Sequence, residues 1–231
     1  MRATPRTIAA WPVLAVIGAA SPALADFSAC DAALGASDPQ RQIELYTTCL
    51  TKGGLPLSDQ AGAFTNRGVA YLKIGESDRA LQDFSWAIED DPNWGAAYID
   101  RGLLYARRGD CAKAASDFDK AVAVSIARLR GPALVHEAWL YATCPDPAIR
   151  NPRKAIDLAN ASLKLQDGPN GRDALAVAFA AAGQFDDAVR EETRAIELAG
   201  KTATPDQLAQ FQVRLDGFRK AAAGALASDH P

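Results

Sequence analysis

The side chains that could do acid–base chemistry in this chain are two histidines and three groups of neighbouring acids. The histidines are His136 and His230, and the acids are Glu89-Asp90-Asp91, Asp186-Asp187 and Glu191-Glu192. A catalytic triad needs a nucleophile held against a base, and a general acid–base site needs carboxyl groups that face one point. Adjacent acids on a helix point in different directions, and a solvated helix face explains them. We therefore predict no catalytic residues and no enzymatic activity.

Four cysteines could form disulfides, a redox centre or a metal site. They are Cys30, Cys49, Cys111 and Cys144. Redox motifs and zinc sites usually contain Cys-x-x-Cys, which is missing here, and the two histidines are the only possible imidazole ligands. A phosphate-binding loop is also missing, because Lys52-Gly53-Gly54 lacks the flanking glycine and the Lys-Ser/Thr ending. We expect no metal and no cofactor.

The N-terminus has the pattern of a secretory signal peptide. Met1 to Arg6 carries two positive charges, residues 8–20 are apolar apart from Pro12, and Ala23-Leu24-Ala25 suits a signal peptidase. An uncleaved membrane anchor needs about 18 or more apolar residues, and this stretch is interrupted too often. We predict cleavage after Ala25 and a periplasmic or secreted protein.

Export changes how charge and cysteines are interpreted. Cleavage removes Arg2 and Arg6 from the 25 basic residues and leaves 23 against 28 acidic residues. This mild acidity argues against nucleic acid as a partner, and no other segment could span a membrane. In an oxidising compartment the cysteines are expected to form two disulfides, although three pairings exist. Lipidation of Cys30 is the alternative for that residue.

Residues 61–94 and 95–128 superimpose at an offset of 34. The coinciding pairs are Arg67 and Arg101, Gly68 and Gly102, Tyr71 and Tyr105, Gly75 and Gly109, Ala80 and Ala114, Asp83 and Asp117, Phe84 and Phe118, and Ala87 and Ala121. This period is typical of solenoids built from helix-turn-helix units. Each unit alone leaves one apolar face exposed, so stacking completes the core.

These two units, NRGVAYLKIGESDRALQDFSWAIEDDP and DRGLLYARRGDCAKAASDFDKAV, resemble the tetratricopeptide repeat (TPR) family. The resemblance implies an all-α, right-handed superhelical solenoid that binds other proteins. First helices would line a concave groove and second helices a convex back. Cys111 and Cys144 would then lie on antiparallel neighbouring helices, which favours their pairing. Antiparallel packing of two short N-terminal helices likewise favours Cys30 with Cys49.

We divide the chain into six parts. They are a signal peptide (1–25), an N-terminal helical pair (26–60), two clear TPR units (61–128), a divergent unit (129–168), a fourth unit (169–200) and a capping helix (204–227). Between the second and third units, the helix containing Ala114 is expected to run on toward Leu129. Gly131-Pro132 would break it, with Pro132 opening a helix that ends near Cys144.

The sequence also predicts how the fourth unit and the capping helix pack. Glu192 stands where Phe84 would be, which should weaken packing there. Thr204, Pro205 and Gln207 form a variant of the capping box. The apolar stripe that follows should cover the open end of the solenoid, with Arg214, Asp216 and Lys220 mostly off the stripe. Its residues are Leu208, Phe211, Leu215 and Phe218.

The first helices of the two clear units are basic, whereas the second helix of the first unit is acidic. Arg67 and Arg101 are expected to pair internally with Asp83 and Asp117. The predicted groove contacts are Thr65, Val69, Leu72, Lys73, Ile99, Leu103, Ala106, Arg107 and Arg108. Such a groove would attract an acidic segment or a free C-terminal carboxylate. Carboxylate-clamp members of the family carry Asn where this chain has Val69 and Leu103, so we do not expect that clamp.

The sequence therefore predicts an exported TPR scaffold that binds a partner protein, as a peptide or helix, in its concave groove. A structural subunit of an envelope assembly is the main alternative. A cysteine-based redox or metal protein is the third possibility.

Overall fold

The computed structural model describes residues 28–52, 54–200 and 203–228. Over these residues the chain forms eleven helices and no strands, which confirms the all-α prediction. The helices are α1 (Ser28–Gly35), α2 (Pro39–Lys52), α3 (Leu57–Lys73), α4 (Ser77–Asp90), α5 (Gly95–Arg107), α6 (Cys111–Val124), α7 (Ala127–Thr143), α8 (Pro152–Leu165), α9 (Pro169–Ala181), α10 (Phe185–Ala199) and α11 (Pro205–Ser228). The predicted signal peptide lies outside the described residues. None of the described helices is both long and apolar enough to cross a membrane.

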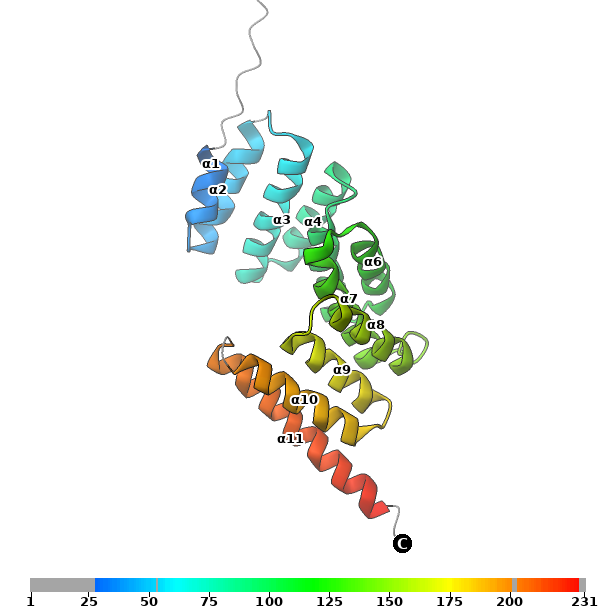
Figure 1. The fold of residues 1–231 in the computed structure, drawn as a ribbon. Helices are drawn as coiled ribbons and strands as arrows, with labels where there is room; N and C mark the ends of the chain where they lie inside the picture. Colours follow the sequence, from blue (N-terminus) through cyan, green and yellow to red (C-terminus); the bar gives the residue numbers. More distant parts are fainter. Residues whose placement is uncertain (1–27, 53, 201–202, 229–231) are drawn as a thin grey trace, which may run out of the picture.

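The helices pair in chain order and stack into a curved solenoid (Figure 1). The closest pairs are α3 with α4, α5 with α6, α7 with α8, and α9 with α10. First helices also contact one another, since α5 packs against both α3 and α7, and α7 packs against α9. First helices therefore form one layer of the solenoid and second helices form the other.

The repeated residues explain how each pair packs. A Cβ atom placed on Gly68 would lie 2.6 Å from Cε1 of Phe84, and one on Gly102 would lie 2.7 Å from Cε1 of Phe118. The two phenylalanine rings are almost completely buried, at 0 % and 1 % exposure. Glycine at these positions lets the ring of the second helix rest directly on the backbone of the first. The sequence pattern thus has a packing cause.

The repeated arginines form internal ion pairs, as predicted. Arg67 donates from Nε and Nη2 to both carboxylate oxygens of Asp83, at 2.8 and 2.7 Å. Arg101 pairs with Asp117 in the same way, at 2.8 Å for both contacts. Each arginine also donates from Nη1 to a hydroxyl of the preceding second helix, at Thr47 and Ser85 respectively. One guanidinium therefore joins three helices and two successive helix pairs.

The predicted helix ends between the second and third units are wrong. Helix α6 ends at Val124, and α7 already begins at Ala127, so Pro132 lies inside α7. Ser125 adopts an extended conformation and is buried against Gly95, which has no side chain to block it. This tertiary contact sets the turn. The preceding Gly131 has no Cβ atom to clash with the ring of Pro132, which removes one of the costs of a proline inside a helix.

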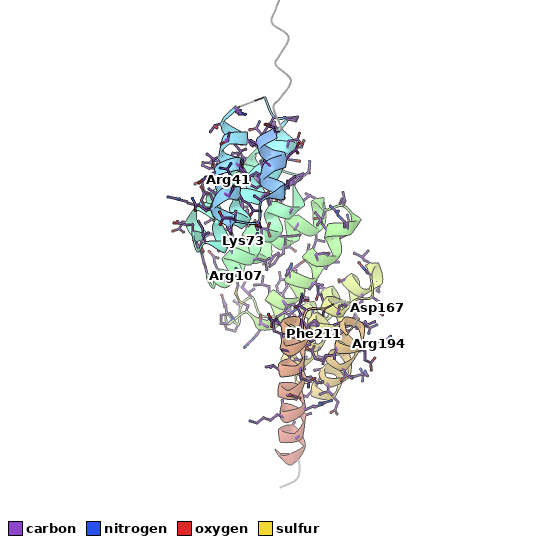
Figure 2. All side chains as sticks on the ribbon, turned by 90° about the vertical axis from the view of Figure 1, so that its left-hand side faces the viewer. Arg41, Lys73, Arg107, Asp167, Arg194 and Phe211 are labelled. Atoms are coloured by element: carbon purple, nitrogen blue, oxygen red, sulfur yellow. A yellow bond between two sulfur atoms is a disulfide. The ribbon has the colours of Figure 1, made fainter. Side chains whose placement is uncertain are left out.

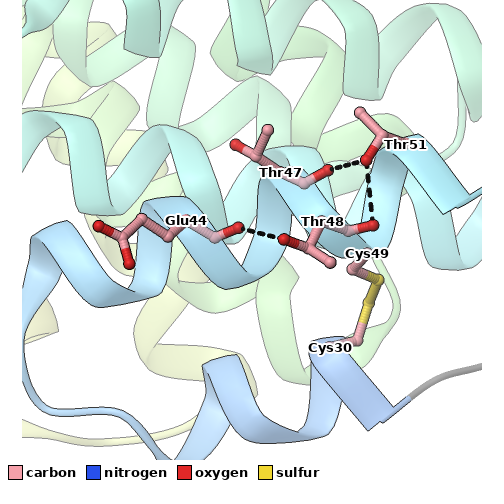
Figure 3. The surroundings of a disulfide bond; sticks show 6 residues. All are labelled: Cys30, Glu44, Thr47, Thr48, Cys49 and Thr51. Carbon is pink, nitrogen blue, oxygen red and sulfur yellow. Dashed lines mark hydrogen bonds between the residues drawn. A yellow bond between two sulfur atoms is a disulfide. The ribbon is translucent and has the colours of Figure 1, made fainter.

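Both predicted disulfides are present. Cys30 joins Cys49 across α1 and α2, with the Cα atoms 5.4 Å apart (Figure 3). Cys111 at the start of α6 joins Cys144 at the end of α7, with a Cα separation of 6.3 Å. All four cysteines are paired, so Cys30 carries no free thiol in this structure.

The C-terminal helix α11 caps the solenoid. The backbone N–H of Thr204 donates to Gln207 Oε1 at 3.0 Å, and that of Gln207 donates to Thr204 Oγ1 at 3.3 Å. Phe211 and Leu215 are buried, and α11 packs along α10. The C-terminal part of α11 extends beyond the neighbouring helices (Figure 1). The predicted capping box and apolar stripe are confirmed.

Candidate interaction groove

A cavity of about 850 Å³ lies between the first helices α5, α7 and α9 and the capping helix α11. We call it the groove. Its apolar walls include Leu103 from α5, Val135 and Trp139 from α7, and Phe211 from α11. Figure 2 looks onto the left-hand side of Figure 1 and shows Lys73, Arg107 and Phe211 on that face. The groove thus faces solvent on the side formed by first helices.

Three of the nine predicted contact residues line the groove. They are Leu103, Ala106 and Arg107, all on α5. Val69 and Leu72 lie one helix further back on α3, half-buried against the cluster around Phe84. Lys73 is exposed at the end of α3.

The other three predicted contacts are occupied within the fold. Thr65 is 5 % exposed, and its hydroxyl donates to the carbonyl of Ala61 at 2.7 Å. Ile99 is 8 % exposed and packs beside Ala133. Arg108 donates from Nη2 to Asp78 of α4 at 2.7 Å. Thr65 and Ile99 present almost no surface to a partner, and Arg108 is already engaged by an acid.

An ionic cluster that the sequence did not predict forms one end of the groove. Arg214 of α11 donates from Nε to Asp173 of α9 at 2.6 Å and to Glu192 of α10 at 3.3 Å. Asp173 and Glu192 are 5 % and 0 % exposed. The expectation that Arg214 lies mostly off the packed stripe was therefore wrong, since two buried acids attract it inward. Glu192 takes part in this cluster where a phenylalanine would pack.

Burial opposes the ionisation of both acids. Burial, followed by the neighbouring charge of Asp173, raises the pKa of Glu192 to about 8. Burial also raises the pKa of Asp173, although Arg214 opposes that effect. Burial and the charge of Asp173 therefore both favour the protonated form of Glu192.

Two further titratable groups with shifted pKa values lie on α7. His136 lines the groove and stacks on Phe118 with the ring centroids 6.1 Å apart, and burial lowers the pKa of His136. Glu137, on the same helix, is 1 % exposed and lies 3.1 Å from Nζ of Lys154. Burial raises the pKa of Glu137 to about 7. Lys154 also donates to the Tyr141 hydroxyl at 2.7 Å, so this second cluster ties α8 to α7.

The described residues contain no group of three or more His, Cys, Asp or Glu side chains that could hold a metal ion. The groove instead combines apolar side chains with amides at its walls. The amides belong to Gln166, Asn170, Gln207 and Gln210. Such a lining can contact both the side chains and the main chain of a bound segment.

Comparison with solved structures gives several matches to helical repeat proteins. A TPR protein from Parabacteroides merdae has a TM-score of 0.64 and 18% identity, covering 87% of this chain and 75% of that one. A thermophilic TPR protein of Thermus thermophilus gives 0.60 and 20%, covering 84% and 94%. PilF of Pseudomonas aeruginosa gives 0.61 and 15%, covering 81% and 89%.

No family model matches the chain, and no curated protein matches it in sequence. The assignment therefore depends on two independent observations. One is the 34-residue repeat with its glycine–phenylalanine packing, and the other is the shared solenoid fold. Together they show that the chain has the solenoid fold of tetratricopeptide repeat proteins.

Proposed function

We propose that this chain is an exported scaffold that binds a segment of a partner protein in the groove. The groove itself carries this proposal. Its lining combines apolar side chains, which include Trp139 and Phe211, with amide side chains. A bound segment could bury apolar side chains against the apolar part of the lining and satisfy its main chain with the amides.

The charge on this face favours an acidic partner. Arg107 lines the groove, and no carboxylate among the described residues pairs with it. Lys73 lies on the same face (Figure 2). These cations would raise the association rate of an acidic segment more than its final affinity.

Export is supported by the N-terminal pattern and by the cysteines. Two disulfides persist in oxidising compartments and are rare in the cytosol. Mass spectrometry of the protein from its native host tests this part. We expect a mature chain that begins at Asp26, and a chain that keeps Met1 would contradict cleavage.

Site-specific photo-crosslinking in the native host tests the groove. A photoreactive residue at Gln210 lies in the groove wall, whereas the same residue at Gln212 is a matched control, exposed on α11 outside the groove lining. We expect a protein crosslinked from position 210 and little or none from position 212. Equal crosslinking, or crosslinking from position 212 alone, would instead favour a structural subunit that uses another face.

A further inference from the structure

Arg214 is held through one edge of its guanidinium group. Nε makes both contacts to Asp173 and Glu192. The central carbon lies 5.5 Å from the centroid of the Trp139 ring and 5.0 Å from that of Phe211. The guanidinium is thus oriented by two buried acids and two aromatic rings.

The other edge of Arg214 faces a different environment. A guanidinium has five N–H donors, and Nε supplies one of them. Among the residues that the structure describes, none accepts a hydrogen bond from Nη1 or Nη2 of Arg214. The side chain is 24% exposed and lines the groove. A fixed, partly desolvated pair of NH₂ groups is therefore available at the groove wall.

We propose that the Nη edge of Arg214 is a carboxylate subsite, which takes the side chain of an aspartate or glutamate in the bound segment. This inference rests on the proposed function, because it requires a segment in the groove. It names the chemistry by which that segment is selected.

A carboxylate fits this edge in geometry and in charge. Two parallel N–H donors match the two oxygens of a carboxylate, and such charge-assisted pairs are strong. The groove is lined by two arginines, Arg107 and Arg214, and by one carboxyl group, that of Asp173. A carboxylate from a partner would balance the excess positive charge of this lining.

The surrounding walls favour an internal acidic residue over a chain end. Gln207 and Gln210 lie on α11 beside Phe211, and Asn170 lies at the start of α9. Their amides offer donors and acceptors to the main chain of a segment that continues past the carboxylate. A segment that ended at Arg214 would leave this part of the lining unused.

Defined peptide pools test the subsite. The probes are acetylated, amidated seven-residue peptides with a central glutamate, flanked by random mixtures of Leu, Phe, Ala, Ser and Asn. A second pool has a central glutamine, and a third has that glutamine and a free C-terminal carboxylate. Retention by the oxidised mature protein is measured by equilibrium dialysis and mass spectrometry. We expect the glutamate pool to be retained about tenfold better than the amidated glutamine pool.

Variants assign the preference to Arg214. Arg214→Lys keeps a cation beside Asp173 but has no second planar edge, so the preference should fall to about twofold or less. Arg219→Lys is the matched control, since Arg219 lies on the same helix, is 55% exposed and pairs with Asp216. It should leave the preference unchanged. If Arg214→Lys does not fold, Arg214→Gln combined with Asp173→Asn and Glu192→Gln removes the cluster without leaving a buried charge.

Four outcomes would overturn the subsite. They are equal retention of the two amidated pools by the wild type, a preference restricted to the free C-terminal carboxylate, a preference that survives loss of Arg214 in a folded variant, and retention of no pool. Crosslinking from Gln210 separates these failures from failure of the proposed function, because that experiment does not depend on acidic residues.

Discussion

Neutralising Glu192 should make the protein more stable at alkaline pH. Its carboxyl group is fully buried, and burial together with Asp173 raises its pKa from 4.5 to about 8. Between these two values the folded protein keeps a proton that the unfolded chain releases. The free energy of unfolding must therefore fall as pH rises through this interval.

The size of the effect follows from the interval. It spans about 3.5 pH units, and each unit corresponds to about 1.4 kcal/mol, so the upper limit is about 5 kcal/mol. Glu192→Gln replaces the protonated acid by a neutral group of the same shape, whose amide can still donate to Asp173. We expect the variant to match the wild type within about 1 kcal/mol at pH 5 and to exceed it by about 2 to 4 kcal/mol at pH 8.5.

Urea unfolding followed by circular dichroism at several pH values between 5 and 8.5 measures this difference. Asp100 and Glu137 also have raised pKa values, to about 6 and about 7, but they are present in both proteins and cancel in the comparison. Glu197→Gln is the matched control. Glu197 lies on the same helix and is 58% exposed beside Arg194, so its loss should shift stability by less than about 1 kcal/mol at every pH.

Parallel stability profiles for the wild type and Glu192→Gln would refute this reasoning. They would mean that Glu192 is already ionised in the folded protein at pH 7, with Arg214 balancing two negative charges. A variant less stable than the wild type at pH 8.5 would lead to the same conclusion.

Three further predictions concern the scaffold, and urea unfolding measures each. Gly68→Ala should lower the free energy of unfolding by about 1 to 3 kcal/mol because its Cβ would meet the buried Phe84 ring. Gly217→Ala is the control and should stabilise the protein slightly, since nothing lies within 4 Å of that Cβ. Equal effects of the two changes would contradict the packing argument. Replacing both Cys111 and Cys144 by alanine should cost about 3 to 4 kcal/mol, and stability equal to that of the oxidised wild type would contradict a structural role. Arg101→Leu should lower the free energy of unfolding by about 3 to 5 kcal/mol, because it leaves Asp117 buried without its partner. The double variant Arg101→Leu/Asp117→Leu should recover much of that loss. Full additivity of the two single changes would contradict the pairing.

The sequence could predict those contacts whose residues recur in both clear repeat units. Arg67 and Asp83 recur as Arg101 and Asp117 at the same offset, so a pairing inferred for one unit is checked by the other. Gly68 with Phe84 recurs in the same manner. The disulfides followed because a solenoid fixes which helices are neighbours, and this reduced three possible pairings to one.

The sequence could not predict those features that depend on a tertiary contact with no equivalent in the other repeat units. The α6–α7 turn is set by the contact of Ser125 with Gly95. These residues are 30 positions apart in the sequence, so no local pattern predicts the contact. Proline is a weak guide there, since Pro132 is accommodated inside α7. Arg108 was expected to face a partner, but its ion pair with Asp78 crosses to another helix.

The fourth unit shows how a departure from the repeat can create a site. Glu191 holds the place of Asp83 and still pairs with an arginine, Arg172, at 2.7 Å, so the structural role of the repeated acid is kept. The next residue is Glu192, where the clear units have a phenylalanine that seals the helix pair. A buried carboxyl group in that place needs a partner, and Arg214 from the capping helix supplies it. The same contact turns the remaining edge of that arginine toward the groove. The repeat thus identifies the scaffold, while the position at which the repeat fails marks the chemistry that could select a partner.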